Sequence, residues 1–124
     1  KKRWGRIGDS PVIGAGTYAD NNSCAVSCTG HGEYFIRHAV AFDVCARYKY
    51  LKESVEKAAD YIIHTELNTN AGNGGLIAVD KLGNIAMPYN SGGMFRGFLY
   101  KEKGSPEIKK GCGIGKKIVV VGEK

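Results

Sequence analysis

The chain has 124 residues, 43% of them hydrophobic, which is enough for the core of one domain. Its formal charge is +6, but the basic excess lies in residues 1–10 and 101–124, and the 90 residues between them carry seven basic and eight acidic side chains. This distribution predicts solvated ends and argues against a nucleic-acid-binding protein. No apolar run approaches the ~20 residues of a membrane span and no stretch is typical of a secretory leader, so we expect no membrane association.

The four cysteines are Cys24, Cys28, Cys45 and Cys112. Their spacing matches neither a Cys-x-x-Cys pair nor a zinc ribbon. Cys24 and Cys28 would lie about 13 Å apart on one face of a strand, too far for a disulfide. We therefore predict small buried thiols in a reducing compartment, with no metal site and no cofactor in this chain.

Small apolar residues and turn signals predict a hairpin near the start of the chain. Residues 11–16 are expected to form a strand, residues 18–22 a turn, and residues 24–28 a buried strand that returns antiparallel. The far end of this hairpin would bring Arg6 and Asp9, an opposite-charge pair, close to the turn that follows the second strand.

That turn, Thr-Gly-His-Gly at residues 29–32, leads from a strand into a helical pattern. Backbone N–H groups at a helix start have no partner within the helix and can face an anion or a developing oxyanion. The hydroxyl of Thr29 would add a second donor, although Thr29 could instead cap the helix. His31 lies inside the turn and is a candidate general base on position alone.

Two helices are expected to follow. The first covers residues 34–48, with Ile36, Val40 and Val44 in a broad buried stripe. Ser54 can cap the second helix. The second helix repeats apolar residues at helical spacing: Val55, Ala58, Ala59, Ile62 and Ile63.

The rest of the chain reads as a loop, a hairpin, a strand, a loose polar segment and a β-branched edge strand. The residues are 68–75, 76–87, 94–100, 104–115 and 118–121, respectively. Because strands and helices come in blocks, the order favours an α+β fold with helices layered on an antiparallel sheet. Two helices cover only one face of such a sheet, so the other face needs a partner.

Six motifs in order give the sequence a family resemblance across residues 4–100, whereas residues 101–124 carry no usable motif. Together the motifs resemble the β-subunit of plant-type asparaginases, also called isoaspartyl aminopeptidases. They are Gly-Arg-Ile-Gly-Asp-Ser-Pro at residues 5–11, Gly-Ala-Gly-Thr-Tyr-Ala-Asp at 14–20, Ser-Cys-Thr-Gly-His-Gly-Glu at 27–33, Gly-Gly-Leu-Ile-Ala-Val-Asp at 74–80, Gly-Asn-Ile-Ala-Met-Pro at 83–88 and Gly-Met-Phe-Arg at 93–96.

The resemblance implies half of the αββα sandwich of the N-terminal nucleophile hydrolases. Residues 1–124 would be a single partial domain, the C-terminal part of a β-subunit. An α-subunit and the start of the β-subunit, both released from one self-cleaving precursor, would complete it, and αβ pairs would form a dimer. The implied reaction is hydrolysis of the side-chain amide of L-asparagine and of β-aspartyl dipeptides, which releases L-aspartate.

The resemblance also implies a substrate clamp. Arg6 would bind the substrate α-carboxylate through its bidentate guanidinium. Asp9 would bind the α-ammonium group, helped by the carbonyl of Gly32. A surface ion pair is the alternative interpretation of Arg6 and Asp9.

The implied oxyanion hole consists of the Thr29 hydroxyl and the Gly30 N–H. His31 would line the substrate site without acting as the base, because in this family the free α-amine of the nucleophilic threonine is the base. That threonine begins the β-subunit, and we expect it to lie outside this chain, which by itself would be inactive.

Two alternatives stay open. Glycosylasparaginase shares the fold and the clamp motif but splits the sugar–asparagine amide, and the chain could be a fragment of such an enzyme. It could also be a non-catalytic binding or structural module. The cysteines favour the cytoplasm, with the periplasm as the alternative.

Overall fold

The computed structural model describes residues 3–115 and 119–123. The chain divides into two compact units, residues 1–90 and 91–124. Helices and antiparallel sheets occur together, in agreement with the predicted α+β class. No helix within the described ranges is both long and apolar enough to cross a membrane.

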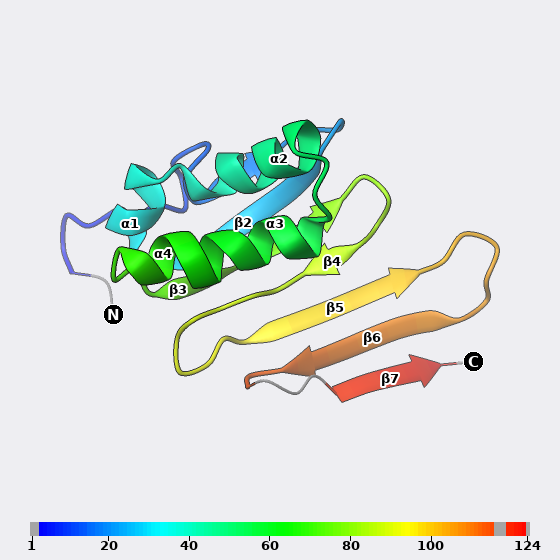
Figure 1. The fold of residues 1–124 in the computed structure, drawn as a ribbon. Helices are drawn as coiled ribbons and strands as arrows, with labels where there is room; N and C mark the ends of the chain where they lie inside the picture. The colour runs from blue at the N-terminus through cyan, green and yellow to red at the C-terminus, as the bar shows by residue number, and fades with distance from the viewer. Residues whose placement is uncertain (1–2, 116–118, 124) are drawn as a thin grey trace. The chain divides into compact units, whose positions relative to one another are not determined.

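The first unit is a four-stranded antiparallel sheet with helices on one face (Figure 1). Its strands, in the order β1-β2-β3-β4, are Thr17–Ala19, Cys24–Gly30, Gly74–Asp80 and Ile85–Ala86. Its helices are α1 (Gly32–Arg37), α2 (Val40–Tyr50), α3 (Val55–Tyr61) and α4 (Leu67–Thr69), and the π-helical turn Ile62–Glu66 joins α3 to α4. The predicted strand at residues 24–28 and the predicted hairpin of β3 and β4 are confirmed.

Alternation along β2 and β3 separates a helix-facing side from an open side. Val26, Cys28 and Leu76 are buried in one cluster with the helices, whereas their neighbours Ser27 and Ile77 are exposed. All five apolar residues predicted for the second helix are buried in the same cluster. The core therefore lies between the sheet and the helices.

The prediction of one continuous helix over residues 34–48 is wrong. The chain forms α1 and α2 with a break between them, where Ala39 takes a left-handed φ of 46°. The break turns Ile36 out of the predicted stripe, so Ile36 is exposed while Val40 and Val44 are fully buried. The four-residue spacing of Ile36, Val40 and Val44 is therefore a coincidence of sequence, since α1 and α2 are separate helices.

The predicted strand at residues 11–16 is also wrong, since these residues form turns and β1 covers the three residues that follow. The carbonyls of Gly14 and Ala15 accept hydrogen bonds from the Phe42 and Ala41 N–H groups, at 2.8 and 3.0 Å. The loop thus satisfies donors at the start of α2 that a preceding helical turn would otherwise satisfy. The contact joins segments that are far apart in the sequence, so neither the predicted strand at residues 11–16 nor the predicted continuous helix could take it into account.

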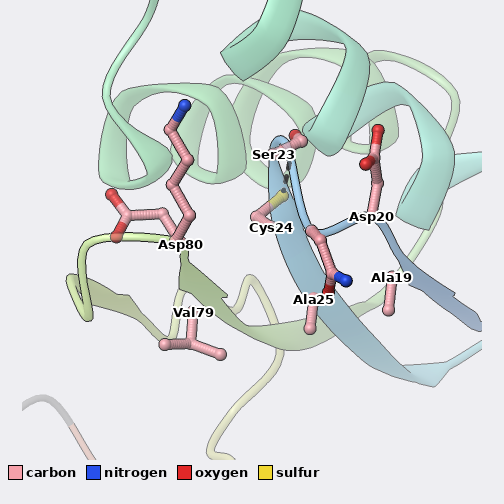
Figure 2. Close-up of a pocket in the computed structure, with 9 residues that line it drawn as sticks. Ala19, Asp20, Ser23, Cys24, Ala25, Val79 and Asp80 are labelled. Atoms are coloured by element: carbon pink, nitrogen blue, oxygen red, sulfur yellow. Dashed lines mark hydrogen bonds between the residues drawn. The ribbon is translucent and has the colours of Figure 1, made fainter.

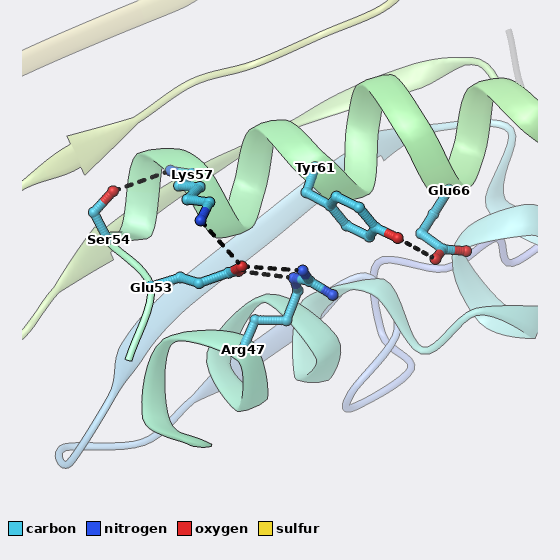
Figure 3. Close-up of polar contacts among 6 residues, drawn as sticks. All are labelled: Arg47, Glu53, Ser54, Lys57, Tyr61 and Glu66. Atoms are coloured by element: carbon cyan, nitrogen blue, oxygen red, sulfur yellow. Dashed lines mark hydrogen bonds and ion pairs between the residues drawn. The ribbon is translucent and has the colours of Figure 1, made fainter. Parts of the chain in front are cut away.

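An ion pair connects α2 to the start of α3, and a serine caps α3 (Figure 3). Arg47 donates to both carboxylate oxygens of Glu53, at 2.9 and 3.2 Å, and its guanidinium carbon lies 3.8 Å from the Tyr61 ring centroid. Ser54 accepts a hydrogen bond from the Lys57 N–H at 3.2 Å, which confirms the predicted cap.

The second unit contains a three-stranded antiparallel sheet in the order β5-β6-β7. Its strands are Arg96–Lys101, Ile108–Gly113 and Val119–Glu123. The predicted loose segment at residues 104–115 is wrong, because β6 pairs on both sides despite its lysines and glycines. The predicted edge strand corresponds to β7, although residue 118 lies outside the described residues. Cys112 is exposed, contrary to prediction, whereas the other three cysteines are free and buried as predicted.

Candidate functional site

The turn between β2 and α1 packs directly on Asp9. Only His31 separates the end of β2 from Gly32, the first residue of α1. A Cβ atom at Gly32 would lie 2.9 Å from the Asp9 backbone nitrogen and 3.0 Å from its Oδ1. The predicted approach of Asp9 to this turn is therefore confirmed.

Asp9 is only 5% exposed, and its Oδ2 is buried without a hydrogen-bond partner among the described residues. Its backbone is fixed on the other side by Gly16, where a Cβ atom would lie 2.3 Å from the Asp9 carbonyl oxygen. A buried carboxylate oxygen without a donor is unfavourable. Oδ2 is therefore a candidate for binding a cationic group of a ligand.

Cys28 lies in the same part of the core and is unsuited to nucleophilic chemistry. Burial, and secondarily the negative charge of Asp9, raise the pKa of the Cys28 thiol. A protonated buried thiol is a weak nucleophile. Cys28 is therefore a packing residue, and its N–H donates to the Gly16 carbonyl at 2.8 Å.

Arg6 pairs with Glu33 instead of Asp9. The Arg6 Nη2 lies 3.4 Å from Glu33 Oε2, and both side chains are more than half exposed. The expected Arg6–Asp9 pair is therefore not the one formed, although both residues lie beside the turn. Glu33, in the first turn of α1, positions Arg6 next to the site.

Thr29 is exposed and belongs to β2, opposite Gly75. The N-cap position of α1 is His31, so Thr29 does not cap that helix. The His31 N–H donates to the Asn73 carbonyl at 2.8 Å, and the His31 ring lies beside Tyr34, with centroids 6.3 Å apart. Its backbone thus fixes the turn.

Gly30 occupies a position that only glycine can take. Its φ is 145°, and a Cβ atom there would lie 2.3 Å from the Asn73 carbonyl oxygen and 2.6 Å from the Gly74 Cα. Gly74, opposite Gly30, directs its own N–H and C=O toward Asn90. In an antiparallel pair that exchanges no hydrogen bonds, both residues direct their N–H and C=O groups away from each other. The Gly30 N–H therefore points away from β3.

Asn90 is the residue that sequence reasoning missed. Its Oδ1 accepts from the Gly74 N–H at 2.8 Å, and its Nδ2 donates to the carbonyls of Gly72 and Ile63 and to Asn68 Oδ1, at 2.9, 3.2 and 3.2 Å. An Asn before Ser-Gly-Gly is typical of a turn, and that local signal says nothing about partners far along the chain.

A hollow of about 340 Å³ lies at the other end of β2 (Figure 2). Asp20 and Asp80 line it, and both already accept hydrogen bonds within their own turns. The hydrogen bond from the Asn22 N–H lowers the pKa of the Asp20 carboxyl most, and the hydrogen bond from Lys49 lowers it further. The described part of the chain holds no group of three or more His, Cys, Asp or Glu residues placed to bind a metal ion. The hollow is therefore a weaker candidate than the β2–α1 turn.

Comparison with known proteins identifies relatives across most of the chain. A family model described as Asparaginase matches residues 1–108. The isoaspartyl peptidase of Salmonella typhimurium is 51% identical over 96 residues, which are 77% of this chain and 31% of that protein. The isoaspartyl peptidase of Escherichia coli is 46% identical over 110 residues, covering 81% and 34%.

A third relative, the putative isoaspartyl peptidase/L-asparaginase of Dictyostelium discoideum, is 48% identical over 98 residues, covering 79% of this chain and 28% of that protein. The chain thus spans about a third of the length of the curated relatives that it matches. The predicted resemblance is confirmed. Because the family model covers nearly the whole sequence, including the β2–α1 turn and Asp9, the chain belongs to the asparaginase family.

Proposed function

We propose that residues 1–124 are part of a threonine-nucleophile amidohydrolase that cleaves the side-chain amide of L-asparagine and of isoaspartyl dipeptides. The names of its relatives, isoaspartyl peptidase and L-asparaginase, support this substrate class. The observation that carries the proposal is the buried, unpartnered Asp9 Oδ2 at the turn between β2 and α1.

In this proposal Asp9 and the carbonyl of Gly32 bind the α-ammonium group of the substrate. The charge on that group would compensate the buried Asp9 carboxylate. Arg6 binds the α-carboxylate and exchanges its exposed contact with Glu33 for a bidentate one. An exposed ion pair contributes about 0–1 kcal/mol, so this exchange costs little.

The proposed oxyanion hole consists of the Thr29 hydroxyl and the Gly30 N–H. It is supported by the exposure of Thr29 and by the outward direction of the Gly30 N–H. The attacking threonine and its α-amine base come from the start of the β-subunit, outside residues 1–124. His31 lines the substrate site and leaves proton transfer to that amine.

We propose that the open side of the β1–β4 sheet packs on a second sheet, supplied by the α-subunit and by the start of the β-subunit. Residues 1–124 then form one partial domain of an αββα sandwich, and αβ pairs form a dimer. Exposed Ile77 and Val79 on β3 support this arrangement, because apolar side chains on a sheet face favour burial. Free buried cysteines support the cytoplasm as the compartment, with the periplasm as the alternative.

The clamp is tested with the full-length protein and its Arg6→Ala variant on L-asparagine and a β-aspartyl dipeptide. We expect kcat/KM to fall about 100-fold or more, as when one partner of a bound charge pair is removed. Arg37→Ala is the matched control, because Arg37 is an exposed arginine on the same helix α1 that contains Glu33, and its kcat/KM should stay within about 2-fold of wild type.

Unchanged kcat/KM in Arg6→Ala would refute the clamp. Faster cleavage of N-acetylglucosaminyl-asparagine by the wild type would assign the chain to glycosylasparaginase instead. Absence of hydrolysis of all three substrates by the assembled protein would favour the non-catalytic module.

A further inference from the structure

We propose that Asn90 is a positioning residue, which fixes the Gly30 N–H through the backbone of residues 72–74. The inference rests on the proposed function, in which the Gly30 N–H stabilises the oxyanion. Asn90 lies within the first unit, as do all of its hydrogen-bond partners described above.

Asn90 binds residues 72–74 with both its side chain and its backbone. Oδ1 accepts from the Gly74 N–H at 2.8 Å, and the Asn90 N–H donates to the Gly74 carbonyl at 2.9 Å. Nδ2 donates to the Gly72 carbonyl at 2.9 Å and anchors this segment to the Ile63 carbonyl in the π-helical turn. One side chain thus joins the start of β3 to the helical layer.

Residues 73 and 74 in turn pack tightly against Gly30. The Asn73 carbonyl accepts the His31 N–H at 2.8 Å, and a Cβ atom at Gly30 would lie within 2.3 Å of the same carbonyl oxygen. A Cβ atom at Gly74 would lie 2.8 Å from the Gly30 Cα. Because close-packed backbone transmits displacement, a shift of residues 73–74 moves Gly30.

Such a shift acts on the transition state more than on substrate binding. An oxyanion donor gains strength when charge develops on the substrate oxygen, so its misplacement lowers kcat. Arg6 and Asp9, which bind the substrate in the proposed function, belong to a different segment and have no hydrogen bond to Asn90 within the described residues. Their contribution to KM should therefore survive the loss of Asn90.

The test measures kcat and KM of the full-length enzyme with a β-aspartyl dipeptide, on preparations whose intact masses show equal precursor cleavage. We expect Asn90→Ala to lower kcat about 10- to 100-fold, as for a displacement of up to about 1 Å, with KM within about 3-fold. Asn90→Asp keeps the acceptor for the Gly74 N–H but loses the Nδ2 donors, and we expect an intermediate kcat.

Asn84→Ala is the matched control. The Asn84 Nδ2 donates to Asp80 Oδ2 at 2.8 Å and fixes the turn at the other end of β3. Asn84 lies at the end of β3 far from the β2–α1 turn. We therefore expect the kcat of Asn84→Ala to stay within about 2-fold of wild type, even if this variant loses as much thermal stability as Asn90→Ala.

The outcomes separate the two proposals. A wild type without hydrolysis overturns the proposed function, and the role of Asn90 with it. An active wild type whose kcat is unchanged in Asn90→Ala and Asn90→Asp overturns the positioning role alone, as does an equal loss of kcat in Asn84→Ala. If Asn90→Ala fails to fold, the positioning role is tested by comparing the kcat of Asn90→Asp with that of Asn84→Ala.

Discussion

Cys28 shows how one buried thiol couples stability to pH. Burial and the neighbouring Asp9 charge raise the pKa of the Cys28 thiol in the folded chain. A folded-state pKa above the unfolded value adds stability that is fully present below the unfolded pKa. That stability is lost as pH rises toward the folded pKa.

We therefore predict that the free energy of unfolding falls above about pH 8.5, where the thiol of the unfolded chain begins to ionise. One such proton contributes a slope of up to about 1.4 kcal/mol per pH unit. Urea unfolding of wild type and Cys28→Ala between about pH 7 and 10 measures this contribution. Equal slopes for the two proteins would contradict it.

At the scale of elements, the Arg47–Glu53 pair connects the end of α2 to the start of α3. Its side chains are only 18% and 12% exposed, and two hydrogen bonds form a fork. A mostly buried pair with this geometry differs from an exposed one, because loss of one partner leaves the other charge poorly solvated.

We predict that Arg47→Met lowers the free energy of unfolding by about 2–3 kcal/mol, since Glu53 then loses its main partner and Tyr61 its cation. Denaturant unfolding of Arg47→Met, Glu53→Gln and the double variant should show a coupling of about 1 kcal/mol or more. Lys57→Ala is the control. Lys57 contacts the same Glu53 at 3.8 Å but is mostly exposed, so its loss should cost less than about 0.5 kcal/mol. A coupling near zero would show that helix packing alone connects α2 to α3.

At the scale of the whole molecule, the side of the β1–β4 sheet away from the helices carries exposed apolar side chains. Ile77 is 47% exposed on β3, and Leu82 is 76% exposed in the turn after it. Both are exposed in this chain, but only Ile77 lies on the sheet face that the proposed second sheet covers.

We predict that Ile77→Lys destabilises the full-length protein by more than about 3 kcal/mol, because the proposed sandwich would bury an unpaired charge. Leu82→Lys should stay within about 0.5 kcal/mol, as for a surface site. Thermal unfolding and size-exclusion chromatography of both variants test this. Equal, small effects would show that the open side does not pack on a second sheet.

Local pattern was sufficient where an element depends on its own residues. Ser54 caps α3, and the apolar residues after it point into the core, because capping and helical periodicity act within a few residues. Short apolar runs and turn signals also predicted β2 and the β3–β4 hairpin. The ordered motifs predicted the asparaginase family. The proximity of Asp9 to the β2–α1 turn was predicted from an antiparallel hairpin, which brings the segment before it close to the end of β2.

Contacts between distant residues decided the rest. Carbonyls of Gly14 and Ala15 accept hydrogen bonds from N–H groups at the start of α2, just after the break at Ala39, and pairing on both sides makes a strand of β6. The partner of Arg6 is Glu33, and Asn90 anchors the segment opposite Gly30. The sequence by itself determined the family, the α+β class and the residues beside the turn, because these follow from local periodicity and motif order. Only the tertiary structure decided which donors and acceptors meet, because hydrogen-bond partners far apart in the chain are selected by packing.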